Sequence, residues 1–231
     1  MFENYPLLKE ITSVKSSTIN RGLAISGILG NCEITERENV IHSINGNFSK
    51  NRPTIIYMAH YDVVNEKYSN VIDNLASVVN LMEFSWENQR YKDKNLFAIF
   101  TNYEETASFD LAGSRIIGDY INAGEFGNVE LVVNLELTSI GRHLWVNNYP
   151  KISLNGIDHT ETNTPFNDAY VINRCGTPAI CIGTVDFANL LQVRKYNYCD
   201  LWSLCHKDSD LYNKEDMWHF VKETLPTFLD I

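Results

Sequence analysis

One apolar stretch of the sequence, residues 54–59, stops at a histidine and a carboxylate that stand two positions apart, His60 and Asp62. A run of this kind is typical of a buried β-strand. A lone His-x-Asp at a strand end is usually an ordinary pair that meets water, because so short a motif often arises by chance. The same side chains could serve a metal site if the rest of the chain supplies further ligands.

Other carboxylates and a second histidine also stand at the ends of predicted core elements. Imidazole nitrogens and carboxylate oxygens suit zinc, and also cobalt or manganese. Two such ions about 3.5–4 Å apart form a known catalytic arrangement, in which one carboxylate bridges the ions and each ion takes one further imidazole and one further carboxylate. Five residues of this chain could supply that set: His60, Asp73, Glu105, Glu136 and His206.

Each of these residues also has a purely structural interpretation. Asp73 stands at the start of a predicted helix, where an aspartate often caps the backbone N–H groups. Glu104 and Glu105 could form a solvated pair in a loop, and His206 could be an ordinary histidine. Glu136 is different, because it interrupts an apolar strand and a buried carboxylate needs a partner or a metal ion. The position of all five candidates at the ends of core elements favours the metal site.

The elements that must position these residues alternate between strands and helices. Apolar strands that alternate with helices indicate a sheet covered on both faces, and the polar residues 44–53 contain Asn45-Gly46, a hairpin signal that makes the sheet mixed. The predicted fold is a three-layer α/β/α sandwich around a mixed, largely parallel sheet, with ligands beyond the carboxyl ends of the strands. We expect strands at residues 23–29, 38–44, 54–59, 95–101, 129–137, 143–146 and 177–183, helices at 73–90, 109–123 and 214–229, and weaker helical character at 164–173.

Composition limits the partners and the compartment. The 231 residues suit one domain, residues 1–231. A net charge of −10 argues against nucleic acid or an anionic membrane as partner, and no apolar stretch is long enough to span a bilayer. The first residues do not read as a signal peptide, and five cysteines without a Cys-x-x-Cys pair fit reduced thiols in the protein core. We expect a cytoplasmic protein, and the oligomeric state stays open.

Taken in order, the motifs resemble the co-catalytic zinc aminopeptidase family that includes bacterial leucyl aminopeptidase and aminopeptidase S. Glutamate carboxypeptidase and glutaminyl cyclase are diverged relatives of that family. Each segment is weak alone, but their order and spacing are specific. The matching segments are AHYD (59–62), VIDNLAS (71–77), NYEE followed by AGSR (102–115), VVNLE (132–136), GTPAI (176–180) and HKDSD (206–210).

The resemblance implies two zinc ions per chain, with Co²⁺ or Mn²⁺ as possible substitutes, and a role for each ligand. Asp73 would bridge the two ions. His60 and Glu136 would complete one site, and Glu105 and His206 would complete the other. Glu136 stands where many members have aspartate, and its extra methylene is compatible with a metal ligand.

The resemblance also implies roles for acidic residues that bind no metal. Glu104 would be the general base, which takes a proton from the attacking water and gives it to the departing amine. Asp62 would accept the second ring N–H of His60, which fixes the tautomer and makes the ring more basic. Asp168 loosely resembles a further acidic position of the family, and Asp210 would stand behind His206.

The leading interpretation is a metal-dependent exopeptidase, an aminopeptidase that hydrolyses the N-terminal bond of a peptide substrate. No basic cluster suggests itself for a C-terminal carboxylate, which favours an aminopeptidase over a carboxypeptidase. A single-zinc cyclotransferase of the glutaminyl cyclase type is an alternative that would need only Asp73, Glu105 and His206. A non-catalytic binding module is a third possibility, although such proteins usually lose ligands or the base. The segment TASFDLAGSR is longer than the family pattern, which leaves the substrate preference open.

Overall fold

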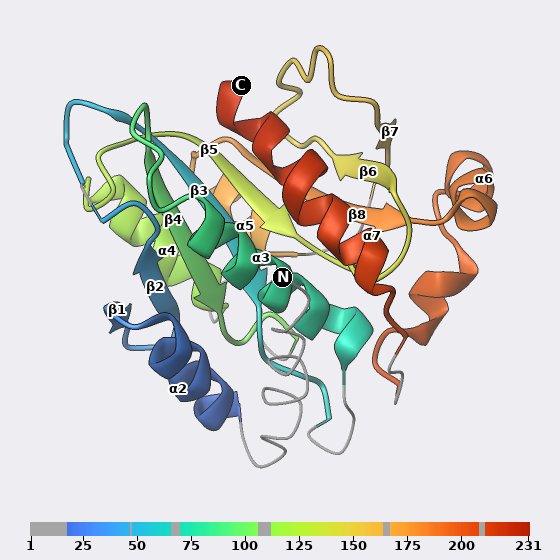
Figure 1. The fold of residues 1–231 in the computed structure, drawn as a ribbon, viewed down its shortest axis with the longest axis horizontal. Helices are drawn as coiled ribbons and strands as arrows, with labels where there is room; N and C mark the ends of the chain where they lie inside the picture. Colours follow the sequence, from blue (N-terminus) through green and yellow to red (C-terminus); the bar gives the residue numbers. More distant parts are fainter. Residues whose placement is uncertain (1–17, 47, 66–69, 106–111, 164–166, 208–210) are drawn as a thin grey trace.

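The computed structural model of the chain describes residues 18–231, except residues 47, 66–69, 106–111, 164–166 and 208–210. At its centre is an eight-stranded sheet with the order β1-β2-β4-β3-β5-β8-β6-β7 (Figure 1). The four central strands β4, β3, β5 and β8 are parallel neighbours, whereas β1, β2 and β6 join antiparallel partners. The strands are β1 (Cys32–Ile34), β2 (Val40–Ser43), β3 (Pro53–His60), β4 (Asn95–Thr101), β5 (Asn128–Leu135), β6 (His143–Asn147), β7 (Thr160–Glu161) and β8 (Ala179–Val185).

Helices cover both faces of this sheet (Figure 1). On one face pack α2 (Thr18–Leu29), α3 (Ala76–Glu87) and the C-terminal run of α7 (Lys214–His219), η3 (Phe220–Thr224) and η4 (Leu225–Asp230). On the other face pack α4 (Gly113–Asn122), α5 (Asp168–Arg174), α6 (Phe187–Tyr196) and η2 (Asp200–Leu204). The short turn η1 (Val71–Leu75) precedes α3. None of the helices in the described ranges has the length and apolar character that crossing a membrane requires.

The strand β3 contributes to both cores because successive side chains point to opposite faces of a sheet. Tyr57 is fully buried in the core under α3, whereas Met58 is fully buried in the core on the other face. Tyr61 continues the alternation just past the strand end, and its hydroxyl donates to the backbone oxygen of Glu38 at 2.6 Å. Tyr61 therefore packs in the same core as Tyr57 and on the face opposite to Met58.

The predicted α/β/α sandwich with a mixed, largely parallel sheet is confirmed. The strand expected at residues 23–29 is wrong, since this segment lies in the helix α2. Ile25, Ile28 and Leu29 contact the core at helical spacing, while Leu23 is 55% exposed. The apolar content of the segment was therefore correct as a sign of burial, but its period is that of a helix.

The hairpin expected at residues 44–53 is also wrong. A turn does form at Asn45-Gly46, but β2 and β3 are not neighbours, because β2 pairs antiparallel with β4, where Val40 lies opposite Phe100. The sheet is mixed for this reason and not because of a hairpin. The structural interpretation of Asp73 as a helix cap is wrong as well, since Asp73 lies inside η1 and the N-cap of α3 is Leu75, which makes no capping side-chain hydrogen bond.

Candidate metal centre

The candidate site lies beyond the carboxyl ends of the central parallel strands. β3 has β4 on one side and β5 on the other, so the order of the strands reverses at this point, where open α/β sheets bind their ligands. Each predicted ligand stands at or just past the end of an element, or in a turn beside it. His60 closes β3, Glu105 follows β4, Glu136 follows β5, Asp73 lies in η1 and His206 follows η2.

The carboxylate of Asp73 faces one imidazole with each of its two oxygens. Its Oδ1 lies 3.2 Å from Nε2 of His60, and its Oδ2 lies 3.4 Å from Nε2 of His206. Both histidines therefore present the same ring nitrogen to this one carboxylate. This is the arrangement expected of a carboxylate that is shared by two cations.

A further carboxylate accompanies each imidazole. Oε2 of Glu136 lies 3.4 Å from Nε2 of His60, and Oε2 of Glu105 lies 2.8 Å from Nε2 of His206. The second oxygen of Glu105, Oε1, is buried without a hydrogen-bond partner in the described part of the chain. A buried carboxylate oxygen without a partner is costly unless a cation approaches it, so the donor set of two imidazoles and three carboxylates fits divalent metal ions.

Asp62 touches both halves of this cluster from behind. Its Oδ1 lies 3.4 Å from Nδ1 of His60, and its Oδ2 accepts the backbone N–H of Glu105 at 3.0 Å. A carboxylate at Nδ1 favours the tautomer that carries its proton on Nδ1 and leaves Nε2 free as a ligand. Asp62 lies next to Nδ1 of His60, and its role in orienting the ring stays a prediction.

Burial and mutual repulsion disturb the ionisation of the cluster. Burial raises the pKa of Glu136 against the opposing charge of His60, and it raises the pKa of Glu105 to about 8. Burial also acts to raise the pKa of Asp73, but the hydrogen bond and charge of His60, with the charge of His206, hold it below its ordinary value. Carboxylates that burial and each other's charge destabilise gain from a divalent cation among them.

Glu104 lies beside the cluster and faces the same cavity. Burial raises its pKa well above the ordinary value, and the negative charges of Glu136, Asp168 and Glu105 add to the shift. Asp168 itself is fully buried and does not line the cavity. One of its oxygens accepts the hydroxyl of Thr101 at the end of β4, so Asp168 lies under the site. Asp210 lies outside the described residues.

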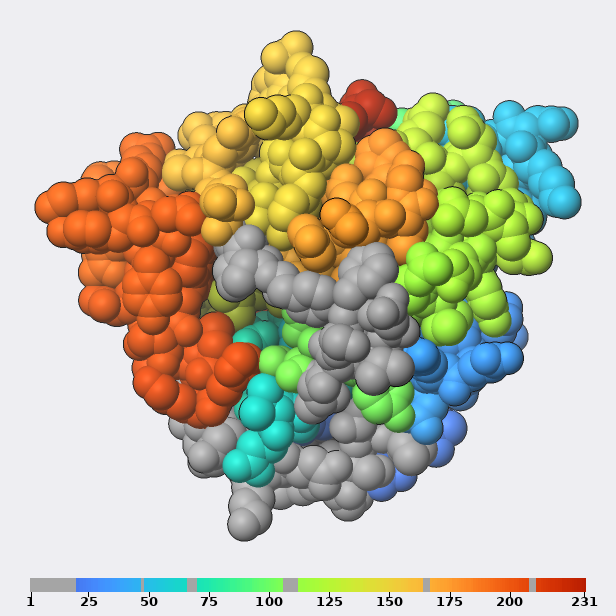
Figure 2. Space-filling view, turned by 180° about the vertical axis from the view of Figure 1, so that it is seen from behind, coloured from blue at the N-terminus to red at the C-terminus, as the bar shows by residue number. Residues whose placement is uncertain are grey.

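A cavity of about 380 Å³ opens over the cluster. Figure 2 shows this face of the molecule, where the teal, green and orange-red segments that carry these residues surround a hollow. Apolar and aromatic side chains also line the cavity, among them Leu137, Trp145, Tyr198 and Trp202. Trp202 packs edge-on against Trp145 at a centroid distance of 5.4 Å. Apart from the two imidazoles, no cationic side chain of the described residues lines this cavity.

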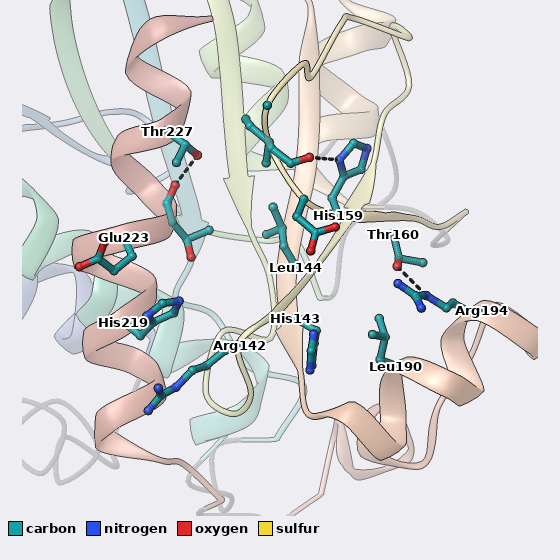
Figure 3. A pocket seen from close by; sticks show the side chains of 14 residues that line it. Arg142, His143, Leu144, His159, Thr160, Leu190, Arg194, His219, Glu223 and Thr227 are labelled. Carbon is teal, nitrogen blue, oxygen red and sulfur yellow. Dashed lines mark hydrogen bonds between the residues drawn. The ribbon is translucent and has the colours of Figure 1, made fainter.

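A second, separate cavity of about 220 Å³ lies between the C-terminal helices and α6 (Figure 3). Three histidines line it, His143, His159 and His219, together with Arg142 and Arg194. His219 comes from α7, His143 from the start of β6 and Arg194 from α6 (Figure 3). Within the described ranges, one group of potential ligands has all its ligand atoms within 4.8 Å of one another, namely His60, Asp73 and Glu105, so the candidate metal site lies in the first cavity.

Sequence reasoning missed several residues of the site. Tyr198 reaches the cavity from just past the end of α6, a helix that the sequence analysis did not predict and whose exposed surface carries Phe187. Cys205 is partly buried against the core, as expected, but it also lines the cavity beside Asp73. The position of Cys205 next to a predicted ligand was the available signal. Trp145 alternates with core residues on β6, and its face could be assigned only once β6 was paired with β8.

Comparison with known proteins gives a consistent picture. A family model described as peptidase family M28 matches residues 39–199. The aminopeptidase LapA of Legionella pneumophila has a similar fold, with a TM-score of 0.76 and 16% identity over 98% of this chain and 69% of that chain. BSAP, a zinc aminopeptidase from Bacillus subtilis, has a TM-score of 0.63 and 16% identity, over 83% of this chain and 48% of that chain. Glutaminyl cyclase of Porphyromonas gingivalis has a TM-score of 0.69 and 13% identity, over 98% of this chain and 96% of that chain. A search of curated protein sequences finds no match.

Proposed function

The chain belongs to peptidase family M28, and from that premise we propose that it is an aminopeptidase that removes the N-terminal residue of peptides with two zinc ions. The observation that carries the proposal is the position of Asp73, whose two oxygens face the Nε2 atoms of His60 and His206 at 3.2 and 3.4 Å. A carboxylate held in this way suits a bridge between two ions. Asp73, His60 and Glu136 would hold one ion, and Asp73, Glu105 and His206 the other.

The chain's own residues would divide the remaining work. When bound, the two ions would make water more acidic and stabilise negative charge on the carbonyl oxygen of the scissile bond. Glu104 would accept the proton of the attacking water and donate it to the departing amine. A raised pKa suits this double role, because the same carboxyl group must take up a proton and release it within one turnover. Asp62 would keep the proton of His60 on Nδ1.

The cavity supports a substrate with a free amino terminus and an uncharged side chain. The carboxylates on one side would attract an α-ammonium group, whereas no Lys or Arg of the described residues lines the cavity to receive a C-terminal carboxylate. The wall of Trp145, Tyr198 and Trp202 would pack against an apolar side chain. An aminopeptidase that prefers bulky apolar residues at the N-terminus follows from this lining.

A glutaminyl cyclase is the second candidate, because the structural match to the glutaminyl cyclase of P. gingivalis covers 98% of this chain and 96% of that enzyme. The match to LapA covers only 69% of that aminopeptidase. A single-zinc cyclase would use Asp73, Glu105 and His206 and leave His60 and Glu136 without a metal. The close contacts of His60 with Asp73 and Glu136 favour the two-ion site.

The deciding experiment combines metal counting with two activity assays. The full chain is stripped of metal with a chelator, and zinc, cobalt or manganese is added back in measured equivalents. Release of anilide from leucyl- and phenylalanyl-anilides and cyclisation of an N-terminal glutaminyl peptide are followed in parallel. We expect anilide hydrolysis that reaches its maximum at two equivalents. Cyclisation that saturates at one equivalent would favour the cyclase, and two bound ions without either activity would favour a binding module.

A further inference from the structure

Glu136 is oriented by a buried asparagine on its own strand. Asn134 stands two residues earlier on β5, so both side chains point to the same face. Nδ2 of Asn134 donates to Oε1 of Glu136 at 3.0 Å, and Asn134 is fully buried while Glu136 is 8% exposed. This hydrogen bond is specific to one carboxylate oxygen. The other oxygen, Oε2, is the one that faces Nε2 of His60 at 3.4 Å.

The backbone that carries Glu136 is held by a second buried asparagine. Nδ2 of Asn74 donates to the carbonyl oxygen of Leu135 at 2.7 Å, and its Oδ1 accepts the backbone N–H of Leu137 at 3.2 Å. One amide group therefore contacts the chain on both sides of Glu136. Leu137 has a φ of 56°, a left-handed conformation that is unfavourable for a residue with a branched side chain, and the hydrogen bond from its N–H helps to hold it.

Asn74 also follows Asp73 directly in the sequence. The residue that would bridge the ions and the strand end that carries Glu136 are thus joined through one side chain, across 61 positions of sequence. An amide suits this position because it donates to one carbonyl and accepts one N–H at the same time. A carboxylate would lose the donor, and an apolar side chain would leave two buried backbone groups without partners.

We propose that Asn134 and Asn74 are positioning residues for the metal centre. We call these two residues the asparagine brace. Asn134 sets the rotation of the Glu136 carboxylate so that Oε2 alone is offered to the ion at His60. Asn74 sets the separation between Asp73 and Glu136. The inference rests on the proposed function, because it assigns these residues to metal ions that Asp73 and Glu136 would hold.

The test is a calorimetric titration of zinc into the metal-free full chain and its variants. Asn134→Ala is expected to weaken one of two binding steps by about 10- to 100-fold, the usual effect of losing a group that orients a ligand, and to leave the other step unchanged. Asn74→Ala is expected to weaken both steps, because it releases the chain next to Asp73 as well as Glu136. A role in folding alone would not separate the two steps in this way.

Asn95→Ala is the matched control, since Asn95 is an equally buried asparagine at the start of β4, the end that lies away from the site. Its Nδ2 donates to Ser49, Arg52 and Thr54 and to no residue of the site. It should lower the melting temperature of the metal-free chain without changing either zinc affinity. Asn134→Leu keeps nearly the same side-chain volume but removes the donor, so it should weaken the same step as Asn134→Ala and replaces that variant if alanine prevents folding.

The outcomes separate the brace from the proposed function. If the wild-type chain binds two zinc ions and both Asn134→Ala and Asn74→Ala bind them with unchanged affinity, the brace is overturned. The proposed function is then left intact. A wild-type chain that binds one zinc ion contradicts the two-ion proposal, and an Asn134→Ala variant that binds that ion equally well then overturns the brace too. A wild-type chain that binds no zinc overturns both.

Discussion

The carboxylate of Asp62 accepts the backbone N–H of Glu105 at 3.0 Å. This bond joins the end of β3 to the turn after β4, and the other oxygen of the same carboxylate lies 3.4 Å from Nδ1 of His60. One buried aspartate thereby contacts one candidate ligand of each proposed metal ion. The two halves of the centre are coupled through Asp62 behind the site as well as through Asp73 within it.

Asp62→Asn should weaken zinc binding by about 10- to 100-fold. An amide that still accepts the N–H of Glu105 must turn its NH₂ group toward His60. The imidazole then has to accept at Nδ1 and carry its proton on Nε2, the nitrogen that faces Asp73. Competition with a chromogenic chelator measures the affinity, and Asp119→Asn, an exposed aspartate on α4, is the control. Equal affinities of Asp62→Asn and the wild type would contradict this role.

Glu104→Gln should keep both metal ions and lose about a hundredfold or more in kcat, since glutamine cannot accept the proton of the attacking water. Metal content and anilide hydrolysis are measured on the same sample, because loss of metal would otherwise imitate loss of the base. Glu125→Gln changes an exposed glutamate and serves as the control. A Glu104→Gln variant with full metal content and near wild-type kcat would exclude Glu104 as the base.

Asp73→Asn should disrupt the binding of both ions, because an amide offers one oxygen where the carboxylate offers two. The two oxygens of Asp73 face different histidines, so neither half of the centre keeps its full donor set. Zinc per chain after dialysis, measured by atomic spectroscopy, gives the answer, with the exposed Asp93→Asn as control. If the variant retained one fully occupied site, Asp73 would belong to a single ion.

The sequence predicts the strands that carry the site because their interiors are apolar and their ends are not. The predicted strands at residues 54–59 and 95–101 correspond to β3 and β4, and His60 and Glu105 stand where those strands stop. The segment 23–29 was assigned the wrong element because a short apolar stretch satisfies either period. The asparagine brace was beyond sequence reasoning, since Asn74 and Leu135 meet only through the tertiary fold.

Gly183→Ala should destabilise the fold near Glu136 by about 1–3 kcal/mol, the usual effect of overpacking a core. A Cβ at this position would lie 2.0 Å from the backbone oxygen of Glu136 and 2.4 Å from the ring of Trp145. Gly27→Ala is the matched control, because a Cβ there meets nothing within 4 Å and alanine in a helix gains about 0.5–1 kcal/mol. Urea unfolding of the metal-free chain measures both, and equal stability of Gly183→Ala and wild type would contradict the packing.

Trp202→Ala should lower the preference for bulky apolar residues more than it lowers activity in general. Trp202 lines the cavity and packs against Trp145 and Tyr198 at centroid distances of 5.4 and 6.0 Å. Its loss removes the wall against which a large substrate side chain would pack. The ratio of kcat/KM for phenylalanyl- and alanyl-anilide should fall by about tenfold or more, the scale that apolar pocket contacts give.

The control for this change is Trp218→Ala, which removes a tryptophan that is 37% exposed on α7 and does not line the cavity. Metal content must stay at the wild-type level in both variants, since Cys205 and His206 follow Trp202 closely in the sequence. A Trp202→Ala variant that loses activity equally on both anilides has lost the site rather than its selectivity. An unchanged ratio at full metal content would place the bulky side chain of the substrate elsewhere in the cavity.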